Sequence, residues 1–267
     1  MTEISAKLVK QLRDETGAGM MDCKRALEDT GGDLEAAKRL LREKGMAQAG
    51  KRAGRATTEG LVADRVDSDH GTLVAVGCET EPVAKNDEFR TFAQKVLEVV
   101  DAEGVGAEQK LEDERVELVA KLGENVSLAG AARFVAVDGS TIAAYVHPPA
   151  SKVGALVNLD GGSPDLARRL AMHIAWSEPR WIAREDVPAE TVTAEREIYA
   201  GSDEVQSKPE QAREKIVDGM MNKRFFAERG GALLDQPWIH DQSKTVAQAM
   251  AEEDAEVLEF ERLALGA

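Results

Sequence analysis

A weak internal repeat between residues 60 and 176 constrains the fold of this chain more than any other feature of its sequence. The first copy runs GLVADRV, GTLVAVGCE and FRTFAQKVLEVV, and the second runs STIAAYVHP, VGALVNLDG and PDLARRLAMHIAW. Each copy has the pattern of strand, turn, strand, loop and helix. Two antiparallel units of this kind can share one core, which predicts an α+β fold. Two unrelated hairpins of similar composition remain the alternative.

The first 45 residues predict three short amphipathic helices separated by glycines. Ser5 and Asp33 are suitable N-caps because their side-chain oxygens can accept hydrogen bonds from a free first-turn N–H. Glycines end each apolar stripe, as they commonly end helices. The three helices are expected from Ser5 to Gly17, from about Met20 to Gly31, and from Asp33 to Gly45.

The rest of the chain divides by composition and periodicity. Residues 46–59 are rich in Ala, Gly, Lys and Arg and predict a linker, which could be partly helical. Residues 187–229 predict a protruding helical hairpin that serves as a dimerisation or docking arm. A solvated hairpin without a partner is the alternative for that segment. The remaining expected units are core subdomain N at 60–139, core subdomain C at 140–186 continued by 230–242, and a C-terminal module at 243–267 in which Ser243 caps a last, acidic helix.

Charge and cysteine content exclude several classes of protein. The net charge of −15 argues against direct nucleic-acid binding, because phosphates are held chiefly by Lys and Arg. Residues 1–55 carry twelve Lys or Arg against nine Asp or Glu, so a mildly basic head precedes an acidic body. No run approaches the roughly 18 apolar residues of a membrane span, and no signal peptide is recognisable, so we expect a cytoplasmic protein without membrane contact. Cys23 and Cys78 are too far apart for a disulfide framework or zinc finger.

Catalytic motifs are missing from the sequence, which predicts a protein that is not an enzyme and needs no metal or cofactor. There is no phosphate-binding glycine loop, and the four histidines lie in different predicted elements. Cys78 ends an apolar strand, where a small buried thiol is commoner than a nucleophile. His173, on the apolar face of a predicted helix, is expected to be a packing residue.

The segment CETEPVAKNDEF, from Cys78 to Phe89, joins an apolar strand to an amphipathic helix and carries no catalytic groups. It resembles the core loop of the bacterial elongation factor Ts family. The stretch from Leu8 to Gly45 resembles that family's amino-terminal module, VHPPASKVGALV its second core subdomain and QPWIHDQSKTVAQ its carboxy-terminal module. The resemblance therefore covers essentially the whole chain.

This resemblance implies a guanine-nucleotide exchange factor that binds GDP-bound elongation factor Tu and promotes GDP release. The family loop reads Thr-Asp-Phe-Val, and its Asp-Phe pair disturbs the partner's magnesium and phosphate contacts. The chain departs from that pattern, because Pro82 replaces the aromatic residue and is expected to hold Glu81 in an extended conformation. The four matching positions are Thr80, Glu81, Pro82 and Val83.

The resemblance also implies a ubiquitin-associated-like (UBA-like) three-helix module that docks on the partner's nucleotide-binding domain. The matching positions there are Lys10, Arg13, Met20 and Met21, with His147 as a weaker candidate in the second core subdomain. Either methionine could instead close the helical core. A homodimer is left open, as are a UBA-like binding module with another partner, an enzyme using Cys78, and RNA binding by the basic head.

Overall fold

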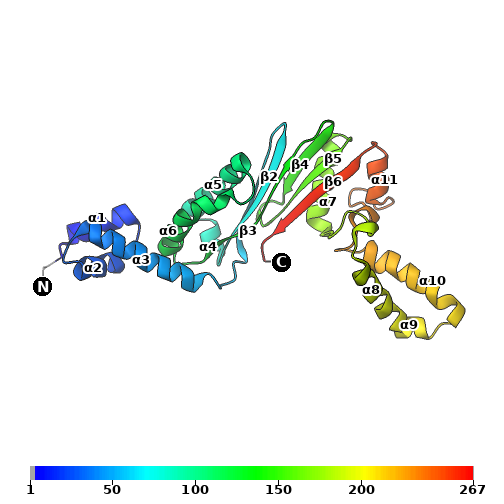
Figure 1. The fold of residues 1–267 in the computed structure, drawn as a ribbon, viewed down its shortest axis with the longest axis horizontal. Helices are drawn as coiled ribbons and strands as arrows, with labels where there is room; N and C mark the ends of the chain where they lie inside the picture. The colour runs from blue at the N-terminus through cyan, green and yellow to red at the C-terminus, as the bar shows by residue number, and fades with distance from the viewer. Residues whose placement is uncertain (1–3, 267) are drawn as a thin grey trace.

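The computed structural model describes residues 4–266 and shows an elongated α+β molecule. Three N-terminal helices form one end, two β-sheets lie in the middle, and a helical hairpin projects from the other end (Figure 1). The predicted fold class is therefore confirmed. None of the helices in residues 4–266 is long and apolar enough to cross a membrane.

The N-terminal helices form where the caps predict them. They are α1 (Ala6–Thr16), α2 (Met20–Asp29) and α3 (Leu34–Arg52). The Ser5 hydroxyl accepts the N–H of Leu8, and the Asp33 carboxylate accepts that of Ala36. Gly17 ends α1 in the left-handed conformation that glycine tolerates best. Their small core consists of Val9, Leu12, Cys23, Ala26, Leu27 and Ala37.

The prediction that Gly45 ends the third helix is wrong. Helix α3 continues through Gly45 to Arg52, so the first half of the predicted linker is helical. The Ala, Met, Gln and Lys residues of this segment are good helix formers, and each of its two glycines costs only about 1 kcal/mol. A Cβ on Gly45 would lie 2.9 Å from the Cβ of Ala120, so glycine allows close packing of α3 on helix α6 (Glu112–Leu122).

Two three-stranded antiparallel sheets form the centre of the molecule. The first contains β1 (Glu59–Val66), β2 (His70–Cys78) and β3 (Val126–Val135) in that order. The second contains β4 (Ser140–Val146), β5 (Val153–Asp160) and β6 (Glu256–Ala264) in that order. In each sheet the predicted hairpin is joined by a third strand from a distant part of the sequence.

The predicted helix at the end of the chain is largely wrong. Strand β6 pairs along β5 and buries Val257 and Leu263, so pairing with a central strand overrides the helix propensity of its Glu, Leu and Ala residues. The last helix is instead α11 (Val246–Ala251), and its N-cap is Thr245 rather than Ser243. Thr245 and Gln248 form a reciprocal capping box, for which Ser243 lies too early in the chain.

The two sheets pack face to face with matching geometry. A glycine is the second residue of both central strands: a Cβ on Gly71 would lie 2.5 Å from Ile142, and one on Gly154 would lie 2.8 Å from Val62. Pairing slips at the same point of both strands, after their sixth residues. The interface core includes Val62, Leu73, Ala75, Ala132, Ala144, Leu156, Leu263 and Leu265.

Helices cover the outer faces of both sheets. On the first sheet these are the short α4 (Glu81–Ala84), α5 (Asp87–Glu103), the 3₁₀ turn Ala107–Leu111 and α6. On the second sheet α7 (Pro164–Ser177) packs on alternate residues of β5, with α11 beside it. The order of layers is therefore helix, sheet, sheet, helix.

His173 on α7 is a packing residue, as predicted. Its ring is fully buried, stacks on Trp238 and hydrogen-bonds to the Gln236 side chain. Burial lowers the pKa of His173 to about 4, so the ring is neutral at pH 7.

The predicted helical hairpin contains α8 (Ala189–Gly201), the short α9 (Asp203–Gln206) and α10 (Glu210–Met220), which runs into a π-helical segment, Met221–Phe226. It has its own apolar cluster, built on Val205, Val217 and Phe226. Two 3₁₀ turns, Arg184–Asp186 and Leu233–Asp235, lie where it joins the second sheet.

Candidate partner-binding surface

The segment that follows β2 forms a short helix where the sequence suggested a loop. Thr80 is extended, with φ −132° and ψ 153°, and Glu81 is the first residue of α4. The expectation that Pro82 holds Glu81 extended is therefore wrong. Proline is tolerated in the first turn of a helix because the N–H it lacks would have no helical partner there.

The start of this segment is anchored to the turn between α6 and β3. Glu124 accepts hydrogen bonds from both the backbone N–H of Thr80, at 3.0 Å, and its hydroxyl, at 2.6 Å. Glu79 accepts the backbone N–H of Asn125 at 2.6 Å and is paired with Arg55 at 3.3 Å. Charged hydrogen bonds of this kind are among the stronger ones in proteins. These hydrogen bonds fix the backbone at Glu79 and Thr80 and thereby the position of the α4 residues that follow.

The residues beyond this anchor face solvent. Glu81 and Pro82 are exposed, whereas Val83 is half-buried and packs against the core beneath α5. Lys85 lies 2.7 Å from the Glu81 carboxylate. The hydrogen bond from Lys85 holds the pKa of Glu81 below its ordinary value, so this carboxylate is ionised at neutral pH. The surface thus presents an ionised carboxylate, paired with Lys85, beside a rigid, uncharged ring.

The candidate residues of the N-terminal helices are also exposed. Lys10 and Arg13 lie on α1, and Met20 and Met21 open α2 with 54% and 59% of their surfaces exposed. The alternative that either methionine closes the helical core is therefore wrong. Two adjacent exposed thioethers form a flexible apolar surface suited to contact with another protein.

His147 follows β4 and is exposed at the same end of the sheets as Cys78, the residue that precedes the anchored segment. Cys78 pairs with Glu59 on β1, and Glu59 is bound at 2.9 Å by Lys152 from the β4–β5 turn that also contains His147. The Tyr145 hydroxyl lies 2.8 Å from Nδ1 of His147. The structure therefore brings the β4–β5 turn close to the start of α4.

Trp176 is a surface residue that the sequence did not single out. It is 68% exposed and borders a groove of about 480 Å³ together with Tyr145 and His147. The sequence places it at the end of an apolar stripe, where a buried position is the default expectation. No signal in the sequence indicates that this side chain is exposed.

Cys78 does not have the environment of a nucleophile. The thiol is fully buried and donates a hydrogen bond to the carbonyl of Thr80. Burial raises the pKa of Cys78 to about 12, which leaves almost no thiolate at pH 7. None of its hydrogen-bond partners among residues 4–266 is a histidine.

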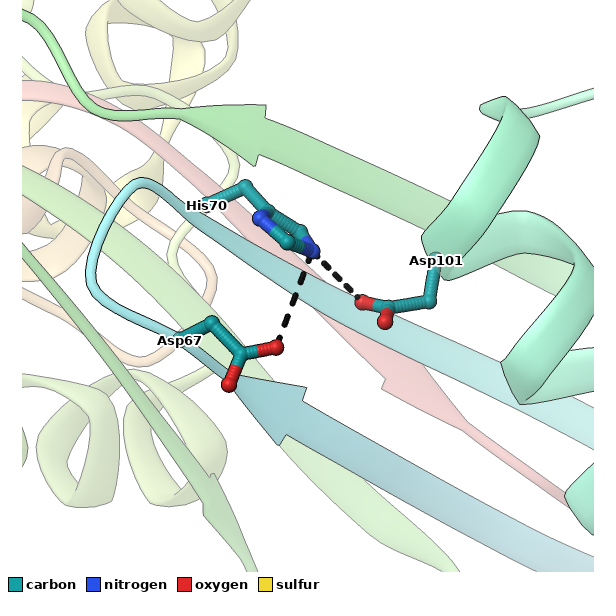
Figure 2. Close-up of side chains that lie close together, drawn as sticks. All are labelled: Asp67, His70 and Asp101. Atoms are coloured by element: carbon teal, nitrogen blue, oxygen red, sulfur yellow. Dashed lines mark hydrogen bonds and ion pairs between the residues drawn. The ribbon is translucent and has the colours of Figure 1, made fainter.

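One group of potential metal ligands lies at the other end of the first sheet (Figure 2). Nε2 of His70 lies 3.0 Å from Oδ1 of Asp101 and 3.8 Å from Oδ2 of Asp67. Asp101, however, also accepts hydrogen bonds from Thr72 at 2.7 Å and from Arg65 at 3.2 Å. Both carboxylate oxygens already have cationic or hydroxyl partners, and Arg65 would repel a divalent ion. The group is an ion-pair network that attaches the β1–β2 turn to α5.

Comparison with known proteins gives one consistent family. A family model described as Elongation factor TS matches residues 79–267. The chain is 39% identical over 272 residues to Elongation factor Ts of Cronobacter sakazakii, and 40% identical to the proteins of that name from Escherichia coli O139:H28 and Shigella boydii serotype 18. Each alignment covers all of this chain and 93% of the relative.

Proposed function

Because the chain belongs to the elongation factor Ts family, we propose that it is the guanine-nucleotide exchange factor for elongation factor Tu. It binds the GDP-bound GTPase in the cytoplasm, disturbs the partner's Mg²⁺ and phosphate contacts, and promotes GDP release during translation elongation. It acts as a non-enzymatic factor, since no covalent step is required of its own residues.

The observation that carries this proposal is the anchored segment ending in an exposed, ionised Glu81. A carboxylate brought next to a bound nucleotide repels its phosphates, and carboxylate oxygens are also ligands that Mg²⁺ accepts. Since the magnesium ion bridges and neutralises the phosphates, weakening its contacts lowers nucleotide affinity. Because Glu124 and Asn125 hold the segment's base, little binding energy is lost in ordering it.

Linkage gives the thermodynamic side of the mechanism. A factor that binds the nucleotide-free GTPase more tightly than the nucleotide-bound form must lower nucleotide affinity by the same ratio. Faster release additionally requires contact before the nucleotide leaves. The exposed surfaces of α1, α2 and α4 can make that contact without a rearrangement of this chain.

Pro82 changes how the segment acts. An aromatic side chain at this position would bury about 150–250 Å² in the partner, far more than a proline ring. Exchange by this chain therefore depends less on a side chain buried in the partner, and more on the Glu81 charge and on displacement of the partner's backbone. Met20, Met21, Lys10 and Arg13 supply the docking contacts on the partner's nucleotide-binding domain, and His147 and its turn supply a further contact.

The proposal is tested by the release of a fluorescent guanine nucleotide from elongation factor Tu, with and without this protein. We expect release to accelerate and to saturate as the protein concentration rises. No acceleration at saturating concentration would exclude exchange activity.

A pull-down from bacterial lysate separates this function from that of a UBA-like module with another partner. If the chain is the exchange factor, the GTPase should be the main bound protein.

A double substitution tests the anchored segment. Glu81→Ala with Pro82→Gly should lower the maximal release rate by about tenfold to a hundredfold, because one charged interaction contributes about 1.5–3 kcal/mol. The affinity for the GTPase should fall much less, since the docking contacts remain. Glu98→Ala, which removes an exposed carboxylate from α5, is the matched control and should change neither quantity. Equal losses of binding and release would mean that the segment only docks.

A further inference from the structure

Residues 121–125, which join α6 to β3, contact both segments proposed to bind the partner. We call this stretch the α6–β3 junction. Lys121 lies in the last turn of α6, Gly123 ends that helix, and Asn125 immediately precedes β3. From this one place, side chains reach the α1–α2 turn, the start of α5 and the base of α4.

Lys121 connects the N-terminal helices to the start of α5. A Cβ on Gly17, in the α1–α2 turn, would lie 2.8 Å from Cδ and 2.9 Å from Nζ of Lys121, so the turn rests directly on the lysine chain. The same Nζ lies 2.6 Å from the Glu88 carboxylate in the first turn of α5. One side chain therefore contacts the turn before Met20 and the helix that follows α4.

The other end of the junction holds the base of α4. Glu124 accepts both hydrogen bonds from Thr80, and the Asn125 backbone donates to Glu79. The Asn125 side chain also donates to the carbonyl of Arg55, in the segment that leads from α3 to β1. The junction thus contacts both proposed partner-binding segments and the chain between them.

The N-terminal helices meet the rest of the molecule mainly through α3, which packs on α6 near Gly45. Arg42 pairs with Asp113 at 2.7 Å, but both side chains are more than half exposed, and such pairs contribute little. A cleft of about 240 Å³ lies between α3 and α6, bordered by Leu41, Val116 and Lys121. Because apolar packing does not fill this cleft, the α1–α2 turn meets α6 through the Lys121 side chain rather than through an apolar contact.

We propose that Lys121 and Glu124 are positioning residues that hold the α1–α2 surface and Glu81 at a fixed separation. Docking of Met20 and Met21 then places Glu81 at the partner's nucleotide site without a further search. This inference rests on the proposed function, and it attributes part of the exchange rate to preorganisation of two surfaces within one chain.

A distance measurement tests the junction without the partner. Spin labels at Lys24→Cys on α2 and Lys85→Cys after α4 report the separation of the two segments, while the native Cys23 and Cys78 are buried. We expect a narrow distance distribution that Lys121→Met broadens and Lys121→Arg preserves. Lys95→Met is the matched control, because Lys95 also joins α5 to α6, through Glu114, but away from the α1–α2 turn. An unchanged distribution in Lys121→Met would overturn the inference.

Exchange kinetics test the consequence. Lys121→Met and Glu124→Ala should each lower the maximal nucleotide release rate about threefold or more, whereas Lys95→Met should leave it unchanged. The reversed pair Lys121→Glu with Glu88→Lys should restore part of the rate lost in Lys121→Glu alone. If the Lys121→Met variant reached the same maximal release rate as the unaltered protein, Lys121 would not be a positioning residue. If the unaltered protein fails to accelerate release, the proposed function fails, and the distance distributions still decide whether the junction holds the segments.

Discussion

His70 forms hydrogen bonds with two carboxylates at the β1–β2 turn. Its two ring nitrogens lie 2.8 Å from Asp69 and 3.0 Å from Asp101, so the ring stands between two carboxylates. The hydrogen bond to Asp69 raises the pKa of His70, although partial burial and the nearby Arg133 oppose the shift. Burial by itself would raise the pKa of Asp101, but hydrogen bonds from Thr72 and Arg65 outweigh it and hold that pKa low. These hydrogen bonds attach the β1–β2 turn to α5.

This arrangement predicts a pH-dependent contribution to stability. Because the pKa of His70 is higher in the folded than in the unfolded state, its contribution is complete below about pH 6.5 and is lost as the pH rises through the raised value. His70→Gln should therefore reduce the free energy of unfolding more at pH 6 than at pH 9, as measured by urea denaturation. Asp69→Asn should show a smaller loss with the same trend. An equal effect of His70→Gln at both pH values would contradict the prediction.

Helix α3 sets the relation between the N-terminal helices and the sheets at the scale of the element. It runs unbroken from Leu34 to Arg52, so one continuous helix packs with α1 and α2 at its start and with the helices on the first sheet at its end. Ala49 is buried in the core under α5, and Arg52 donates a hydrogen bond to the carbonyl of Val119. Gly45 lies at the closest contact with α6, where a side chain would meet Ala120.

Two glycines in α3 provide a matched test of that contact. Gly50→Ala should raise the free energy of unfolding by about 0.5–1 kcal/mol, because alanine is the better helix former and nothing lies within 4 Å of the new Cβ. Gly45→Ala should lose this gain, since its Cβ would lie 2.9 Å from that of Ala120. Urea denaturation measures both. A similar gain from the two substitutions would show that α3 and α6 are not closely packed.

At the scale of the whole molecule, the contact between the two sheets determines how the repeated units are joined. Each central strand faces the other sheet with a glycine and then a leucine, Gly71 and Leu73 in one and Gly154 and Leu156 in the other. The glycines allow the strands to approach while the leucines fill the space between them. The anchored segment and the β4–β5 turn lie near one another because the sheets pack in this way.

Filling one of these glycine positions tests the contact. Gly154→Ala should lower the free energy of unfolding by about 1–3 kcal/mol, because its Cβ would lie 2.8 Å from Val62 in the opposite sheet. Gly201→Ala, at the end of α8 with open space around it, is the control and should have little effect. Denaturant unfolding followed by circular dichroism gives both values. If Gly154→Ala left the free energy of unfolding unchanged, the two sheets would not be closely packed at this position.

The sequence by itself determined the helices and hairpins whose signals lie in neighbouring residues. Serine, aspartate and glycine signals located α1, α2 and the start of α3, and apolar periodicity located the two hairpins with α5 and α7. The family resemblance pointed to residues 80–83 and to Met20 and Met21, whose exposure the structure then established for Glu81, Pro82 and both methionines. Their roles in exchange stay predictions.

Tertiary structure alone decided the features that depend on residues far apart in the chain. Strands β3 and β6 form because β2 and β5 offer them free edges, and the close approach of α3 to α6 at Gly45 exists only in the folded molecule. Likewise, Lys121 meets Gly17 and Glu88, and Glu124 meets Thr80, only after α6 has packed on the first sheet. No local pattern encodes these contacts, because their energy comes from pairing and packing between segments that the sequence separates.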